Sequence, residues 1–272
     1  MVLDLQGYKD FWLQRYIDLK KFGKLYSPRG QKTLEIENYQ FEGSPLWKLP
    51  SFKERKLSVK YIAGEFKWYL SADRNNTSIE DYAILWKTIK NQKKPYWNSN
   101  YGYYIFKEGQ FEYCVNQLKY DKDSRQAVIV INRPDVMMSD TKDKICTSII
   151  TFRIRDNRLN MSVHMRSNDF IFGTQIDYFQ FATIQEMLYI MLKETYPDLQ
   201  LGNYCHKADS FHIYERHFSL LDKIVENNGE NFEYIRVPLI KGVDEVRSLI
   251  RNQYNIKYEF SRWIIVENMF KS

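Results

Sequence analysis

The sequence has few of the residues that mark specialised classes of protein. Its 272 residues include 11 glycines, 7 prolines and 3 cysteines, which excludes a collagen-like chain and a disulfide framework. No apolar run approaches the roughly 18 residues of a membrane-spanning helix, and the mean hydropathy is −0.55. Charged residues interrupt the first 25 positions, where a secretory signal needs a continuous apolar stretch. We therefore expect a cytoplasmic protein with free thiols and no membrane contact.

The charge balance favours an anionic partner. Lys and Arg number 40 and Asp and Glu 34, giving a net charge of +6 that suits nucleotides, polyglutamates or nucleic acid. The basic residues are spread along the chain, and the densest short run, residues 90–94, holds three charges. A nucleic-acid-binding arm usually concentrates more charge, so we do not expect nucleic acid as a partner. Aromatic residues make up 16% of the chain and indicate a flat-walled pocket.

Hydrophobic spacing predicts both helices and strands. Apolar residues recur at intervals of three and four in the expected helices, which are 3–22, 57–71, 78–90, 177–195, 214–227 and 241–255. Alternating polar and apolar residues predict a strand at 33–39, and apolar runs predict strands at 127–131, 148–154 and 158–164, the last two joined by a hairpin turn. The composition of residues 92–105 predicts a loop. Because no repeat or linker interrupts the chain, we expect a single α+β domain over residues 1–272.

The cysteines and histidines offer one candidate nucleophile and no standard metal site. Cys146 directly precedes a predicted strand, where it is either a buried structural thiol or a nucleophile. Cys205-His206, followed by His212 and His217, matches no zinc spacing and lacks a second cysteine pair. We therefore expect no metal.

A set of motifs follows Cys146 in a specific order. Twenty residues after it comes Arg-Ser-x-Asp, then a glycine, then an acidic residue at position 177. The motifs and single residues that accompany this stretch are Asp123-Ser124-Arg125, His212-x-Tyr214-x-x-His217, Asn100-Tyr101-Gly102 and Glu65. As a set they resemble the thymidylate synthase family over about residues 25–220, while residues 221–272 form a divergent C-terminal region.

The resemblance implies a fold and a reaction. The fold is a single domain with a central mixed β-sheet flanked by helices, packed through the sheet into a homodimer in which Arg125 reaches the partner's site. The reaction transfers a one-carbon unit from 5,10-methylenetetrahydrofolate to C5 of a pyrimidine nucleoside monophosphate, without a metal. Cys146 matches the nucleophile that adds to C6, which makes C5 nucleophilic.

The resemblance also implies roles for the other motif residues. Residues expected to bind the nucleotide are Arg29, Arg125, Arg166, Ser167, Asp169, Asp177, His212 and Tyr214. Residues expected to bind the folate are Trp86, Tyr101 and Asp169, and Glu65 would manage water and protons at N3 and N4. Arg166 beside the thiol would lower its pKa and supply thiolate. The alternative interpretations are a surface salt bridge for Arg166 and a helix cap for Asp169.

Position 177 carries the prediction of the substrate. Uracil-using members have Asn here, whose amide donates to O4 and accepts from N3–H. Asp177 cannot donate as a carboxylate, but it can accept from the N4 amino group of cytosine and from a protonated N3. Asp177 and Cys146-Thr147 both resemble the deoxycytidylate hydroxymethylases of large phages, which implies the host cytoplasm if the protein is phage-encoded. The alternative for Asp177 is a cap of the helix that starts there.

The last chemical step distinguishes a hydroxymethylase from a methylase. In a hydroxymethylase water adds to the exocyclic methylene at C5, whereas in a methylase the folate delivers hydride. Thymidylate synthases typically end in an apolar tail that closes the site, and this chain ends differently, at residues 268–272. We therefore expect conversion of dCMP to 5-hydroxymethyl-dCMP. The alternatives are a methylase or hydroxymethylase acting on dUMP or CMP, and a non-catalytic nucleotide- or RNA-binding relative.

Overall fold

A computed structural model describes residues 4–90, 96–237, 239–251 and 265–267. The helices are α1 (Leu5–Phe22), α2 (Val59–Leu70), α3 (Ile84–Ile89), α4 (Gln110–Tyr120), α5 (Pro134–Met137), α6 (Gln175–Lys193), α7 (Phe218–Glu226) and α8 (Val243–Ile250). Short helical turns are η1 (Pro28–Gly30), η2 (Lys53–Arg55), η3 (Ser78–Asp81), η4 (Tyr103–Lys107), η5 (Phe170–Thr174) and η6 (Glu215–His217). The strands are β1 (Lys24–Tyr26), β2 (Thr33–Gly43), β3 (Pro50–Phe52), β4 (Val128–Val130), β5 (Thr147–Arg155), β6 (Arg158–Met165), β7 (Asn168–Asp169), β8 (Gln200–Tyr214), β9 (Phe232–Arg236) and β10 (Ile265–Glu267).

A mixed sheet forms the centre of the fold. Its strands lie in the order β1-β2-β8-β6-β5-β4, and β7 pairs with β8 beside this path. Strand β8 runs parallel to β6 and β7, while the other neighbours in this sheet are antiparallel. A second, three-stranded sheet has the order β10-β9-β3. The α+β class with a mixed central sheet and flanking helices, expected from the sequence, is confirmed.

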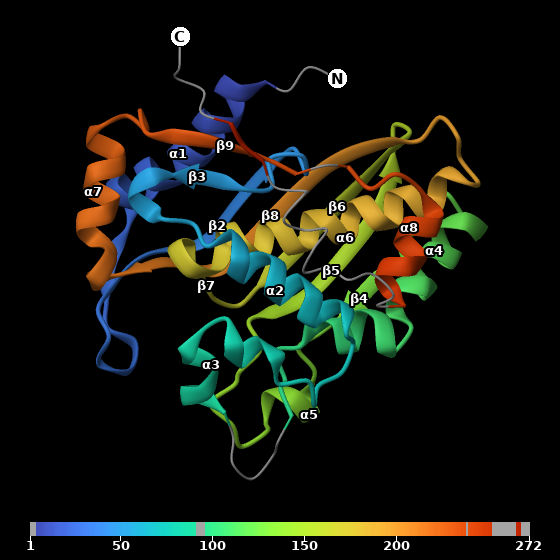
Figure 1. Cartoon of the computed structure of the whole chain (residues 1–272), viewed down its shortest axis with the longest axis horizontal. Coiled ribbons are helices and arrows are strands. Elements are labelled where there is room, and N and C mark those ends of the chain that lie inside the picture. Colours follow the sequence, from blue (N-terminus) through green and yellow to red (C-terminus); the bar gives the residue numbers. More distant parts are fainter. Residues whose placement is uncertain (1–3, 91–95, 238, 252–264, 268–272) are drawn as a thin grey trace.

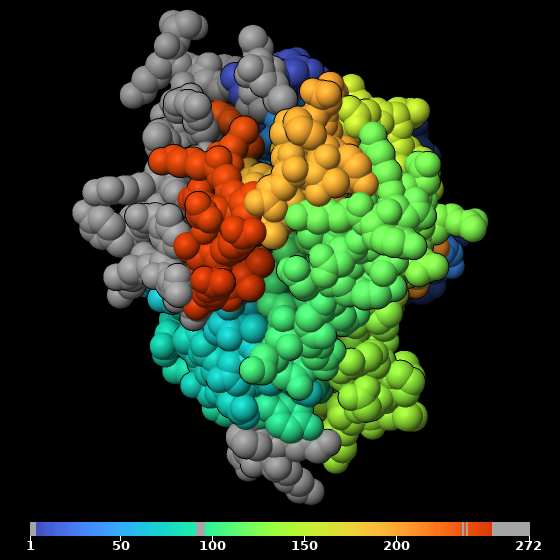
Figure 2. Space-filling model, turned by 90° about the vertical axis from the view of Figure 1, so that its right-hand side faces the viewer, coloured from blue at the N-terminus to red at the C-terminus, as the bar shows by residue number. Residues whose placement is uncertain are grey.

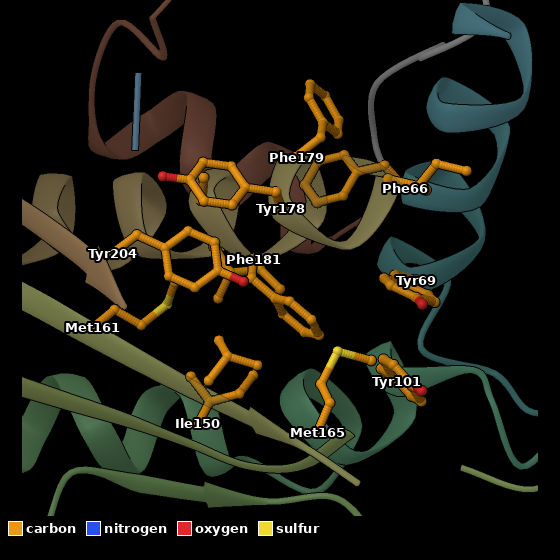
Figure 3. Packing of buried hydrophobic residues seen from close by; sticks show 14 of the residues in the cluster. Phe66, Tyr69, Tyr101, Ile150, Met161, Met165, Tyr178, Phe179, Phe181 and Tyr204 are labelled. Carbon is orange, nitrogen blue, oxygen red and sulfur yellow. The ribbon is translucent and has the colours of Figure 1, made fainter. Parts of the chain in front are cut away.

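Helix α6 is the central element of the helical layer. It lies over the sheet beside α2 and α8 (Figure 1), and its residues from Gln175 to Leu188 are buried almost without interruption. A helix that is apolar on nearly all sides belongs in the interior. Tyr178 packs against Tyr204 of the sheet with ring centroids 4.3 Å apart (Figure 3). The helix ends before Tyr196-Pro197, as the sequence predicted.

The opposite face of the sheet is more open. Alternate side chains of β2, β5, β6 and β8 point away from α6, because successive residues of a strand face opposite sides. They line a hollow of about 370 Å³, formed by Gln40, Glu42, Ile149, Thr151, Arg153, Ser162, Val163, His164, Cys205 and Lys207. Most of these side chains are only partly buried. This face is therefore available to a second layer.

The region after residue 220 packs onto the rest of the molecule. Helix α8 lies on the surface against α4 and the end of α6 (Figure 2). Glu194, just after α6, forms ion pairs with Lys119 of α4 and Arg247 of α8, at 3.1 and 3.7 Å. The helix predicted over 241–255 is observed from Val243 to Ile250, and residues 252–255 lie outside the described residues.

Three segments differ from the sequence prediction. The helix expected over 78–90 is divided into η3 and α3. The predicted loop 92–105 is helical from Tyr101 onward, because Asn100 Oδ1 accepts from the Tyr103 N–H and starts a turn there. The fifteen-residue strand β8 had no counterpart in the prediction, since polar residues such as Lys207 and Asp209 weaken its apolar pattern. Pairing with β2 on one side and β6 and β7 on the other holds it in the sheet.

Candidate active site

Cys146 lies at the entrance to β5, where three contacts fix its backbone. The register of β5 and β6 pairs Thr147 with Met165, so the hairpin brings Arg166 beside Cys146 despite twenty intervening positions. The Arg166 N–H donates to the Cys146 carbonyl at 2.9 Å. The Tyr101 hydroxyl accepts from the N–H groups of Cys146 and Thr147 at 3.4 and 3.5 Å. The thiol is half-buried, so it stands in a fixed position at the edge of the core.

Arg166 lies against the thiol but does not by itself supply a thiolate. Its Nη2 is 3.6 Å from Cys146 Sγ, and its Nε donates to the Ile145 carbonyl at 2.8 Å. Burial raises the pKa of the Cys146 thiol, and this effect is larger than the lowering by Arg166. The prediction that Arg166 lowers the pKa is right in direction, but the net pKa is raised. Among the described residues Arg166 forms no ion pair, so a surface salt bridge does not account for it.

Glu65 is held in a buried hydrogen-bonded network on α2. Its Oε1 accepts from the Tyr61 hydroxyl at 2.9 Å, and its Oε2 accepts from Gln180 Nε2 at 3.1 Å. Trp86 Nε1 donates to the Tyr61 hydroxyl at 3.1 Å and so orients it. Burial raises the pKa of Glu65 to about 7, which lets this carboxyl exchange a proton near neutral pH.

Asp177 lies in the first turn of α6 and faces the same interior. Its Oδ2 accepts from Asn168 Nδ2 at 2.7 Å. Burial, and secondly the nearby Glu65, raise the pKa of Asp177 to about 8. The N-cap position of α6 belongs to Thr174, so the alternative interpretation of Asp177 as a helix cap is not what the structure has. Two carboxyl groups with raised pKa values therefore share one region.

Asp169 does cap a helical turn. Its Oδ1 accepts from the Ile171 N–H at 2.9 Å at the start of η5. The capping interpretation is therefore observed, while the nucleotide- and folate-binding roles stay predictions. Asp169 pairs with His212 in the register of β7 and β8, which places both at one end of the sheet.

The remaining nucleotide-binding candidates surround this end. His212 is buried with Nδ1 3.2 Å from Ser210 Oγ, and its ring lies 5.2 Å from that of half-buried Tyr214. Ser167 is half-buried beside exposed Arg166. Arg29, exposed in η1, lies near enough for its charge to lower the pKa of Cys146. Of these residues, Arg29 has a direct electrostatic relation to the thiol, and the nucleotide-binding roles of all four stay predictions.

Arg125, also a nucleotide-binding candidate, lies far from Cys146 of its own chain. Ala127 O accepts from the Phe152 N–H, and Val128 pairs with Thr151, so the segment before β4 lies beside the far end of β5. Cys146 precedes the near end of that strand. At about 3.3 Å per residue the two residues are separated by roughly 25 Å, more than an arginine side chain spans. Arg125 is exposed and does not reach Cys146 of its own chain.

The two aromatic folate candidates are buried within the protein. Trp86 packs on Trp68 and Trp97 with centroids 5.1 and 5.4 Å apart, and it is 9% exposed. Tyr101 is 5% exposed and packs on Tyr69. Trp86 Nε1 donates to the Tyr61 hydroxyl, and the Tyr101 hydroxyl accepts from the Cys146 N–H. The folate-binding roles of Trp86, Tyr101 and half-buried Asp169 stay predictions.

No group of three or more metal-ligating side chains occurs among the described residues. Cys205 and His206 illustrate why, because neighbours in β8 face opposite sides of the sheet. Cys205 lines the open face, whereas His206 is fully buried under α6. Of the described helices, none has the length and apolar character needed to cross a membrane.

Several residues of the site were missed at the level of the sequence. Tyr61 and Gln180 hold Glu65, and Asn168 holds Asp177. Asn168 occupies the variable position of Arg-Ser-x-Asp. The motif therefore showed where Asn168 lies in the sequence but not that it contacts Asp177. Tyr61 is four residues before Glu65 on α2, a spacing that places both side chains on one face.

Comparison with known proteins gives one family. The family model described as thymidylate synthase matches residues 16–258. The deoxycytidylate 5-hydroxymethyltransferase of Enterobacteria phage T6 is 29% identical over 232 residues, 82% of this chain and 92% of that protein. The deoxyuridylate hydroxymethyltransferase of Bacillus phage SP01 is 27% identical over 255 residues, 86% of this chain and 65% of that protein. The thymidylate synthase of Bacillus licheniformis is 23% identical over 220 residues, 76% of this chain and 74% of that protein.

Proposed function

This chain belongs to the thymidylate synthase family, enzymes that transfer a folate-borne one-carbon unit to a pyrimidine nucleotide, and we propose that it converts dCMP to 5-hydroxymethyl-dCMP. The observation that carries the proposal is the carboxyl group of Asp177, which lies in the interior beside Glu65 and is held by Asn168. A carboxyl group at this place suits cytosine, because cytosine presents donors where uracil presents O4.

Asp177 also supplies the proton that the reaction needs. With a pKa of about 8 the carboxyl group holds a proton at neutral pH. Transfer of that proton to N3 of cytosine leaves a carboxylate, which then accepts from N3–H and from the N4 amino group. The positive charge on the ring withdraws electrons from C6, where the Cys146 sulfur forms its bond. Arg166 at 3.6 Å from Sγ favours the thiolate that makes this attack.

Glu65 is the residue that we assign to proton transfer and water. Methylenetetrahydrofolate supplies the one-carbon unit when it is bound, with Asp169, Trp86 and Tyr101 as the residues that hold it. The pKa of about 7 lets Glu65 accept a proton from water that adds at the exocyclic carbon. The T6 and SP01 relatives are both named as hydroxymethyltransferases, which supports addition of water over hydride.

Arg125 supports a shared active site. Because it lies roughly 25 Å along β5 from Cys146, it serves the site of a second subunit in a homodimer that packs through the open sheet face. Hybrid dimers test this proposal. Mixing Arg125→Ala protein with Cys146→Ala protein should restore part of the activity, since one of the two sites in each hybrid is then intact. No recovery after verified subunit exchange would count against a shared site.

A second candidate substrate is dUMP, and one observation favours it. If Asp177 keeps its proton, the carboxyl group can donate to O4 and accept from N3–H, as the asparagine of uracil-using relatives does. The raised pKa makes this form accessible at neutral pH. The SP01 relative is named for deoxyuridylate.

One incubation tests the proposed function. The protein is given dCMP, dUMP or CMP, each with labelled methylenetetrahydrofolate, and the nucleotide products are identified by mass. The expected product is 5-hydroxymethyl-dCMP, and Cys146→Ser should form none, whereas Cys114→Ser should remain active. A 5-methyl product would contradict the hydroxymethylase, and a preference for dUMP or CMP would contradict the substrate.

A further inference from the structure

A chain of buried hydrogen bonds runs from β8 to Asp177. The Tyr204 hydroxyl lies 2.8 Å from His206 Nδ1, and His206 Nε2 lies 3.0 Å from Asn168 Oδ1. The amide nitrogen of Asn168 then donates to Asp177 Oδ2 at 2.7 Å. Tyr204 and His206 are fully buried and Asn168 is 3% exposed. Solvent therefore takes no part in the chain, and each group depends on its neighbour.

The neutral states of Tyr204 and His206, together with the donation from Asn168 to Asp177, set the direction of every bond in this chain. Burial lowers the pKa of His206 to about 3 and raises that of Tyr204 well above its usual value, so both are neutral. A neutral imidazole donates through one nitrogen and accepts through the other. Because the Asn168 amide nitrogen donates to Asp177, its Oδ1 accepts from Nε2–H of His206, and Nδ1 then accepts from the Tyr204 hydroxyl. The Thr174 hydroxyl also donates to Asn168 Oδ1 and reinforces this orientation.

The orientation of the Asn168 amide decides which form of Asp177 is favoured. An N–H donor stabilises the ionised carboxylate. If the amide were reversed, its oxygen would face Asp177 and would favour the protonated carboxyl group. The carboxylate pairs with cytosine protonated at N3, whereas the protonated form pairs with uracil. A group that lies outside the substrate pocket can thus bias the choice of base.

We infer that Tyr204 and His206 are positioning residues for base selection, because their hydrogen bonds keep the Asn168 amide donating to Asp177 and so favour cytosine over uracil. This inference rests on the proposed action on dCMP. The Phe41 ring stacks on His206 at 5.1 Å and 23°, which holds the imidazole in the plane that the two hydrogen bonds require. Tyr204 and His206 are fully buried, so we assign them no contact with the substrate.

The test compares two buried tyrosines that pack on each other. Tyr204→Phe removes the hydroxyl that begins the chain, and Tyr178→Phe removes a hydroxyl that donates to the Ser44 carbonyl at 3.0 Å. The measurement is the ratio of kcat/KM for dCMP to kcat/KM for dUMP. Tyr204→Phe should lower this ratio by about five- to tenfold, the effect of about one hydrogen bond. Tyr178→Phe should leave the ratio unchanged, although both variants lose a buried polar contact.

A second pair of variants tests His206. His206→Leu removes the donor to Asn168 and should lower the ratio further than Tyr204→Phe does. His206→Gln keeps an N–H donor and should recover part of the ratio. The alkaline limb of the dCMP pH profile should also move to higher pH in His206→Leu, because Asp177 loses a bond that favours its ionised form and keeps the proton it gives to N3 up to a higher pH. The titratable groups that face Asp177 and stay unchanged in this variant are Glu65, Asp169, Cys146, Tyr61, Tyr69, Tyr101 and Tyr204.

The possible outcomes separate this inference from the proposed function. If the wild-type protein prefers dUMP, the proposed substrate is wrong. The inference still requires Tyr204→Phe to move the ratio toward dUMP more than Tyr178→Phe does. If the two tyrosine variants give equal ratios, or His206→Leu matches the wild type, the inference is wrong whichever nucleotide the wild type prefers.

Discussion

Asp177 and Glu186 lie on the same helix, α6, but Glu186 is buried, Asp177 is partly buried, and their surroundings differ. Nine residues correspond to two and a half helical turns, so the two side chains leave opposite sides of α6. Glu186 pairs with buried Lys48, and its Oε1 accepts from the Ile240 N–H at 2.7 Å. Asp177 has no cationic partner among the described residues and accepts from the neutral amide of Asn168.

The different surroundings give the two carboxyl groups different roles. A buried charge that is paired with an opposite charge is stable but chemically occupied. Glu186 therefore ties the loop after β2 and the segment before α8 to the helix. A buried carboxyl group without a cation has a raised pKa and can exchange a proton. Asp177 costs stability and retains the capacity to react, as functional sites commonly do.

The largest expected effect is on the choice of base. Asp177→Asn replaces the carboxylate with an amide that pairs with O4 and N3–H of uracil. A mismatch of buried polar groups can change discrimination by about 10⁴, so kcat/KM should fall for dCMP and rise for dUMP. Initial rates with both nucleotides measure this. The matched change Glu186→Gln on the same helix should leave the preference unaltered, and a shift of similar size there would remove the contrast between the two positions.

The next effect is on stability. Lys48→Met leaves Glu186 buried without its cation, and breaking one side of such a pair costs about 3–5 kcal/mol. Urea denaturation followed by circular dichroism should show this loss, and the ratio of dCMP to dUMP activity in the folded fraction should not change. The double variant Lys48→Met with Glu186→Leu should recover much of the stability. If Lys48→Met is as stable as the wild type, the ion pair with Lys48 does not stabilise buried Glu186.

A smaller effect is expected from the pH dependence of folding. Glu65 and Asp177 have pKa values of about 7 and about 8 in the folded protein, above unfolded values of about 4. Between pH ~4 and pH ~8 the folded state holds more protons than the unfolded state, so stability falls as pH rises through this window. Glu65→Gln or Asp177→Asn should therefore stabilise the protein at pH 8 by on the order of 1–3 kcal/mol. Thermal melts at pH 5 and pH 8 measure the difference, which should be smaller at pH 5 than at pH 8; equal effects at both pH values would refute the raised pKa values.

The smallest effect concerns the network around Glu65. Tyr61→Phe removes a hydrogen bond that lowers the pKa of Glu65, so the pH profile of kcat should move to higher pH by roughly one unit or less. Tyr196→Phe is the control, because its hydroxyl donates to the Leu118 carbonyl on the distant helix α4. The expectation fails if both variants give the wild-type profile.

Local sequence patterns predicted much of the helical layer and the hairpin. Helices α1, α2 and α7 lie within the predicted ranges, and α6 begins two residues before its predicted start, because their apolar residues recur at helical spacing. Strands β5 and β6 follow from apolar runs on either side of a turn. The hairpin then places Arg166 beside Cys146, as the order of the motifs implied.

The motif residues themselves were visible in the sequence, but their partners were not. Asp177 stood out because its residue type departs from the asparagine of uracil-using relatives. That its neighbour is Asn168, and that Asn168 is oriented by His206, depends on β7 and β8 lying side by side under α6. Such contacts join residues 38 positions apart, and no periodicity records them.

Burial is the property that only the tertiary structure decided. The sequence placed a thiol near an arginine and two carboxyl groups in helices, and their chemistry follows from residue type. The pKa values depend on how much water the fold removes around each group, because desolvation disfavours the charged form. Packing raised the pKa of Cys146, Glu65 and Asp177 and left Glu186 paired with Lys48. The sequence thus determined which groups could react, and the close packing of α6 against α2 and the sheet decided which of them hold a proton.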